Sequence, residues 1–77
     1  METNPEPTEY EIRIKGLLDE RRIRWFEGLT VSPRPSGETI ISGPIMDQAA
    51  LYGILNRIRD LGLPLLLVRR SDFEYEE

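Results

Sequence analysis

The segment at residues 47–68 constrains the fold of this chain most, because it contains a helix start, a helix stop and the strand that follows. Asp47 can cap the free amides of a first helical turn. Gly62 stands where a helix ends in a left-handed residue, and Pro64 prevents the helix from resuming. The sequence LLLV at 65–68 then predicts a buried strand. Between cap and stop, apolar residues recur at helical spacing: Ala50, Leu51, Ile54, Leu55, Ile58 and Leu61.

The N-terminal half predicts three more strands and one short helix. Tyr10, Ile12 and Ile14 alternate with charged residues, which is typical of a half-buried strand. Asp19 can cap a helix of about two turns that ends at residue 26. A loop rich in Pro, Ser and Gly is flanked by the apolar residues Leu29, Val31, Ile40 and Ile41, and this pattern predicts a hairpin. We expect the Gly-Pro pair at 43–44 to close its second strand.

The predicted element order is β-α-β-β-α-β. Two crossover units joined by a hairpin indicate an α+β fold of the ferredoxin-like type. We expect a four-stranded antiparallel sheet of strand order 4-1-3-2 with two helices on one face, the first of them short. Residues 9–70 should form one domain. Residues 1–8 and 71–77 should form a disordered acidic tail and an acidic C-terminal tail.

The composition argues against an enzyme. The chain has no Cys and no His, which excludes thiolate and imidazole ligands and the commonest general base. No phosphate-binding loop, metalloprotease motif or nucleophile motif is present. We therefore expect no catalytic residues, no metal and no cofactor. No apolar run reaches about 18 residues, and the first residues lack the pattern of a signal peptide. The prediction is a cytoplasmic protein without a membrane contact.

The charge distribution leaves two interpretations open. All ten basic residues lie within 13–70, whereas both ends are acidic and the net charge is −4. The acidic ends act as solubilising tails, or they shield a basic face from nucleic acid. RNA-binding domains of this element order stack bases on aromatic residues of the first and third strands. Here the third strand reads GETIISG, and Tyr10 lies in the buried phase of the first, so the sequence argues against nucleic-acid binding.

The last strand predicts a contact surface. It is apolar on both faces, although this topology places it at a sheet edge, where an uncovered face would normally be polar. Either a tail or a second copy of the chain covers it. Because a domain of this size buries a small core, we favour the second copy, with Leu65 and Leu67 in the contact.

Two further surfaces are candidates for partner binding. The outward face of helix 47–61 carries Ala49, Tyr52, Gly53 and Asn56, where the small residues would leave a groove beside Tyr52. The alternative is a tolerated Gly on a solvated face. Trp25 either packs at the rim of the core or, with the arginines around it, contacts a partner.

The sequences WFEGL at residues 25–29 and DQAALYGILNRIRDLGLPLL at 47–66 resemble a group of short bacterial proteins of unknown role. The resemblance runs from residue 10 to residue 68. Related sequences often carry His where Tyr52 stands and a small polar residue where Leu67 stands, so a chemistry that used this His is lost here. The resemblance implies a stand-alone bacterial domain and implies no activity.

These observations lead to three functional hypotheses. The first is a non-enzymatic module for self-assembly or protein–protein interaction in a bacterial cytoplasm, with contacts through strand 65–68 and the outer face of helix 47–61. The second is a regulatory domain that binds a small ligand at a subunit interface. The third is nucleic-acid binding. The expected partner is the chain itself or another protein.

Overall fold

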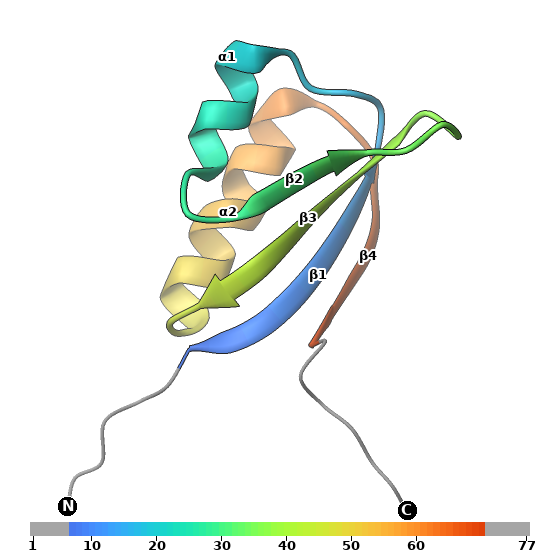
Figure 1. The fold of residues 1–77 in the computed structure, drawn as a ribbon. Coiled ribbons are helices and arrows are strands. Elements are labelled where there is room, and N and C mark those ends of the chain that lie inside the picture. Colours follow the sequence, from blue (N-terminus) through green and yellow to red (C-terminus); the bar gives the residue numbers. More distant parts are fainter. Residues whose placement is uncertain (1–6, 71–77) are drawn as a thin grey trace, which may run out of the picture.

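The computed structural model describes residues 7–70, which form one antiparallel four-stranded sheet with its helices on one face (Figure 1). The strand order is β2-β3-β1-β4, which is the predicted order 4-1-3-2 read from the other edge. Of the predicted tails 1–8 and 71–77, residues 1–6 and 71–77 lie outside the described residues, whereas Thr8 already belongs to the first strand. The elements along the chain are β1 (Thr8–Lys15), α1 (Glu20–Ile23), the 3₁₀ turn η1 (Arg24–Phe26), β2 (Thr30–Pro33), β3 (Glu38–Ile45), α2 (Gln48–Leu61) and β4 (Leu65–Arg70).

The core lies between the sheet and the helices. Its fully buried cluster is Ile12, Ile14, Phe26, Ile41 and Ile58, which come from β1, η1, β3 and α2. The alternation in β1 therefore places its isoleucines on the helix side, as predicted. Thr39 is the one buried polar residue among those described, and its hydroxyl donates to the carbonyl of Gly16 at 2.6 Å. This bond satisfies a side chain that would otherwise lose a hydrogen bond on burial.

The predicted capping residues of the two helices are confirmed. The carboxylate of Asp47 accepts from the amide of Ala50 at 2.8 Å, and Gly62 ends α2 at a left-handed φ of 77°. The carboxylate of Asp19 likewise accepts from the amide of Arg22 at 2.8 Å. The first helix is only one turn of α-helix continued by η1, and Phe26 is its contribution to the core. Ile23, three residues before Phe26, is 36% exposed.

The prediction that Gly43-Pro44 closes β3 is wrong, because the strand continues to Ile45 and pairs with the start of β1. The carbonyl of Glu38 accepts from the amide of Arg34 beside β2, so the even-numbered residues of β3 turn their backbone groups toward β2. β2 pairs no further than the position of Ser42. The nitrogen of Pro44 therefore faces a side with no strand partner, where the missing N–H breaks no ladder bond.

Candidate functional site

The two edges of the sheet differ in length and in exposure. The edge strand β2 has four residues and ends at Pro33, both of which blunt an edge against further pairing. The edge strand β4 has six residues, and its side chains include Leu65 at 49% exposure and Leu66 at 46%. Leu67 is half-buried. β4 is thus the apolar edge that the sequence predicted, and no described residue seals it.

A register shift in the pairing of β1 with β4 changes which leucines share a face. Val68 is paired with Ile12 and Leu65 with Ile14, so both are aligned with core-facing positions. Leu67 is paired with Arg13, on the open face of the sheet. Simple alternation would place Leu65 and Leu67 on the same face of the sheet. The extra residue in the shifted pairing places them on different faces instead. The two predicted contact residues therefore belong to one edge but to different sides of it.

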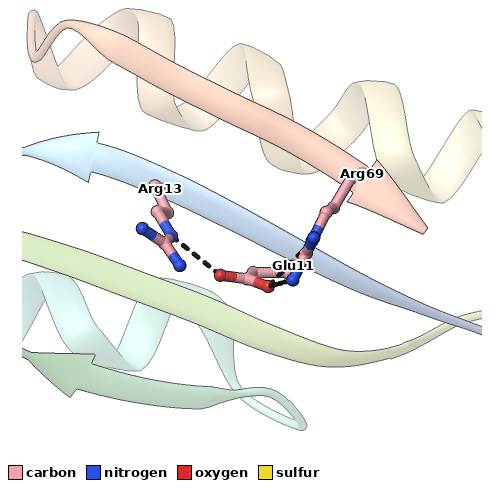
Figure 2. A network of polar contacts seen from close by, with 3 residues as sticks. All are labelled: Glu11, Arg13 and Arg69. Atoms are coloured by element: carbon pink, nitrogen blue, oxygen red, sulfur yellow. Dashed lines mark hydrogen bonds and ion pairs between the residues drawn. The ribbon is translucent and has the colours of Figure 1, made fainter. Parts of the chain in front are cut away.

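The open face of the sheet carries a polar network centred on Glu11. Arg13 donates to one oxygen of this carboxylate at 2.8 Å, and Arg69 donates to the other at 2.9 and 3.1 Å. Figure 2 shows the carboxylate between the two guanidinium groups, in front of the strands, with the helices behind. The hydrogen bond from Arg13 is the main reason that the pKa of Glu11 lies below its ordinary value, and Arg69 adds to the effect.

This network covers much of Glu11. Its side chain is only 13% exposed, although no helix of residues 7–70 lies on that face. The neighbouring positions of β1 on the same face are Glu9, Arg13 and Lys15, since the alternate positions carry the core isoleucines. Tyr10 is in the core-facing phase, so β1 and β3 present no aromatic platform for stacking bases on the open face.

A groove of about 360 Å³ lies between the η1–β2 connection, the end of β3 and the first half of α2. Its walls are residues 25–29, residues 44–46 and a face of α2 formed by Ala50, Gly53, Ile54 and Arg57. The structure thus brings together two predicted site residues, Trp25 and Gly53, which sequence reasoning had assigned to separate surfaces. Trp25 is 39% exposed and Met46 is 55% exposed.

The other predicted residues of α2 do not line this groove. Ala49, Tyr52 and Asn56 lie three and four positions apart on an exposed stripe of their own, and Tyr52 is 58% exposed. The small pair that faces the groove is Ala50 with Gly53, where the sequence predicted Ala49 with Gly53. Ala50, predicted as part of the apolar stripe, is exposed and lines the groove.

Sequence reasoning missed Arg57, Met46 and Glu27 as groove residues. Arg57 follows Gly53 by one helical turn, so the helical spacing could have placed it on the same face. Its guanidinium donates to the backbone carbonyl of Trp25, which joins the two walls. Glu27 comes from a segment that only the fold brings next to α2. Met46 directly precedes the cap Asp47, so its place beside the first turn of α2 could have been found from the sequence.

Gly53 has no packing reason to be glycine. A Cβ built on it would meet no atom within 4 Å, and its backbone shows no left-handed conformation. By contrast, a Cβ on Gly43 would lie 2.9 Å from the side chain of Leu29, so close packing explains that glycine. Glycine inside a helix costs about 0.5–1 kcal/mol relative to alanine. At Gly53 the effect is open space on the groove wall.

The described residues contain no group of three His, Cys, Asp or Glu side chains that could hold a metal ion. Every buried side-chain nitrogen or oxygen described has a hydrogen-bond partner. Within residues 7–70, no helix has both the length and the hydropathy that a membrane crossing requires. The described residues present three candidate surfaces: an apolar strand edge, a charged sheet face and a groove with an apolar lining.

Comparisons with known proteins place the chain in a family. No curated protein and no solved structure matches it. A family model described as a domain of unknown function, DUF8691, matches residues 9–69. These limits coincide with the sheet and helices from β1 to β4. Since the match covers nearly the whole folded domain, the chain belongs to the DUF8691 family.

Proposed function

We propose that this domain acts by binding rather than by catalysis, and that its partner is a second copy of the same chain joined along β4. In this proposal the fold is ferredoxin-like, which the element order and the strand order support. The resemblance to short bacterial proteins makes a bacterial cytoplasm the setting that we propose.

The exposed edge strand β4 is the observation that carries this proposal. An edge strand presents a row of backbone N–H and C=O groups that can pair with another chain. Here two leucines on that strand are almost half exposed, whereas the opposite edge is short and ends in proline. Pairing with another strand would satisfy the backbone groups and cover the leucines together.

Charge favours an antiparallel pairing between two copies. Arg69 and Arg70 lie at the C-terminal end of β4, and Leu65 lies at its start, about 17 Å away at the rise of an extended strand. In an antiparallel pair about a two-fold axis, the arginines of the two copies lie at opposite ends of the contact. A parallel pair would place like charges side by side, which is less favourable even though Glu11 offsets part of the charge of Arg69.

The contact should be weak, because a single six-residue strand buries less area than a standard protein interface. Light scattering or sedimentation from about 1 μM to about 1 mM spans the range in which such a dimer dissociates. Leu66→Lys should shift the dimer to monomer across this series. Thr30→Lys on the β2 edge is the matched control, because Thr30 is also exposed at a sheet edge, and it should leave the dimer unchanged. A wild-type chain that stays monomeric throughout would contradict the proposal.

Cross-linking locates the contact, because the chain has no cysteine of its own. A disulfide forms only where two Cα atoms approach to about 4.4–6.8 Å. In an antiparallel pair, one of Leu66→Cys, Leu67→Cys and Val68→Cys should lie near the two-fold axis and should cross-link readily. Thr30→Cys should not. Equal cross-linking at Thr30 would indicate random collision and would overturn the assignment to β4.

The outward stripe of α2 is the alternative contact surface, with Tyr52 as its most exposed large residue. Both helices lie behind the sheet, away from the free edge of β4 (Figure 1). Tyr52→Ala should therefore leave a dimer paired through β4 unchanged. Loss of the dimer in Tyr52→Ala, with Leu66→Lys harmless, would move the interface from the strand edge to the helix.

A further inference from the structure

The groove beside Trp25 combines an apolar lining with two opposite charges that are not paired with each other. Glu27 and Arg57 both line it. Among the described residues, the carboxylate of Glu27 makes no hydrogen bond or ion pair, and Arg57 donates to the carbonyl of Trp25 instead. Such a groove can satisfy one positive and one negative group of the same ligand while it covers an apolar body.

We propose that this groove binds the zwitterion of an apolar α-amino acid, with its carboxylate on Arg57, its ammonium group on Glu27 and its side chain against Trp25 and Met46. The proposal is independent of pairing through β4, because no residue of β4 lines the groove. It is carried by the charge arrangement and by the open space at Gly53.

The dimensions of the groove suit a ligand of this size. Ligand sites in proteins commonly measure about 300–1,000 Å³, and this groove, at about 360 Å³, is at the small end of that range. Aromatic and thioether side chains such as those of Trp25 and Met46 pack well against both aliphatic and aromatic groups. The groove is open to solvent on one side, so we expect a dissociation constant on the order of 1 mM or tighter.

One hydrogen bond anchors the exposed guanidinium of Arg57 beside the groove. Its hydrogen bond to the Trp25 carbonyl uses one of the five N–H donors of a guanidinium group, and the remaining donors suit the two oxygens of a carboxylate. The same bond links the backbone at Trp25 to α2. A ligand seated between them is therefore next to the single tryptophan of the chain, whose emission reports its arrival.

Gly53 gives the ligand room. Gly53→Ala should raise the melting temperature by a few degrees, because alanine is the better helix former and its Cβ meets no atom within 4 Å. The same methyl group projects into the groove and should weaken binding. The variant thus separates loss of binding from loss of folding.

The test is a titration of the full chain with leucine, methionine and phenylalanine, followed by Trp25 fluorescence and by ligand-observed NMR. N-acetyl-leucine lacks the ammonium group and leucinamide lacks the carboxylate, so each should bind about 10-fold or more weakly than leucine. Arg57→Gln should weaken leucine by about 10–100-fold, and Glu27→Gln should bring leucine to the affinity of N-acetyl-leucine. Tyr52→Ala, outside the groove, is the control and should bind as the wild type does.

Three outcomes would overturn the proposal. The first is no change in emission or NMR signal with any of the three amino acids at millimolar concentration. The second is equal binding of leucine and its two singly charged analogues, which would show that the groove does not recognise the ammonium and carboxylate groups of the ligand. The third is tighter binding of N-acetyl-leucinamide than of leucine, which would indicate an extended peptide as the occupant. The titration is performed at dilutions where the chain is monomeric. Its results can therefore be interpreted whether or not the chain associates through β4.

Discussion

The two faces of the sheet are built from alternate residues of the same strands, yet they are stabilised in different ways. On one face, Ile12 and Ile14 of β1 are almost fully buried against the helices. On the other, Glu11 and Arg13 of the same strand form a charged network with Arg69 (Figure 2), and no helix or strand of residues 7–70 lies over it. The side chains of β1 are therefore removed from solvent by apolar packing on one face and by ion pairing on the other. The variants below test how unequal the two contributions are.

Ile14→Ala should have the largest effect, because it creates a cavity in the core, where the side chain is fully buried. Such a change costs about 2–5 kcal/mol, a large share of the stability of a small domain. Urea unfolding followed by circular dichroism measures it, and Ile14→Val provides a milder version at about 0.5–1.5 kcal/mol. Ile40→Ala is the matched control, because Ile40 is the half-buried neighbour of Arg13 on the open face. Equal losses at Ile14 and Ile40 would mean that the two faces do not differ.

Thr39→Val should come next. The hydroxyl of Thr39 is buried on the core face and donates to the carbonyl of Gly16, so valine fills the volume but removes the donor. The expected loss is about 1–2 kcal/mol, because a buried acceptor is left without this partner. Ser32→Ala, at a half-buried position of β2 aligned with Ile40, provides the comparison on the open face. A Thr39→Val variant as stable as the wild type would show that the carbonyl finds another donor.

Glu11→Gln should have a smaller effect that depends on pH. The pKa of Glu11 is lowered in the folded state, mainly by the hydrogen bond from Arg13, so ionised Glu11 stabilises the fold. This contribution is present above the ordinary pKa of a glutamate, about 4.3, and is lost as the pH falls through the lower folded value. We expect the variant to be less stable than the wild type at neutral pH by about 0.2–1 kcal/mol, the usual value of an ion pair at the protein surface.

The pH series is the check on that prediction. Urea unfolding of both chains at neutral pH and at pH about 3 should show that the difference between them shrinks on acidification. A difference that is the same at both values would mean that the charge of Glu11 does not contribute to stability. Arg69→Gln should reproduce part of the effect, because Arg69 adds to the lowering of the pKa.

Leu66→Thr should have the smallest effect on the stability of the monomer. The side chain is 46% exposed at the sheet edge, so its replacement should change stability by no more than about 0.5 kcal/mol at low protein concentration. At high concentration the same change should weaken the proposed dimer. A melting temperature measured across a dilution series separates the two effects, because only a dimer makes it depend on concentration.

Much of the fold could be predicted from local patterns. Asp47 and Gly62 marked the ends of α2 because capping depends on a few neighbouring residues. The alternation at Tyr10, Ile12 and Ile14 identified both β1 and its buried face. The strand order followed from the element order and from the rules for connections. These features need no knowledge of what lies across the sheet.

The candidate sites were only partly predictable. The sequence identified β4 as an apolar edge, but the register shift that separates Leu65 from Leu67 depends on how β4 pairs with β1. It singled out Trp25 and Gly53, but it could not show that the segment of Trp25 and Glu27 meets α2 in one groove. Whether Pro44 ends β3 likewise depended on where β2 stops.

The sequence by itself determined where the main helix begins and ends, which face of β1 is buried and which strand is left as an apolar edge. These properties depend on caps, backbone preferences and hydrophobic periodicity, which act over a few residues. Only the tertiary structure decided the reach of β3, the side on which each leucine of β4 lies, and the meeting of Glu27, Trp25, Gly53 and Arg57 in one groove. Those properties depend on contacts between segments far apart in the chain, and such contacts form only when the whole core packs.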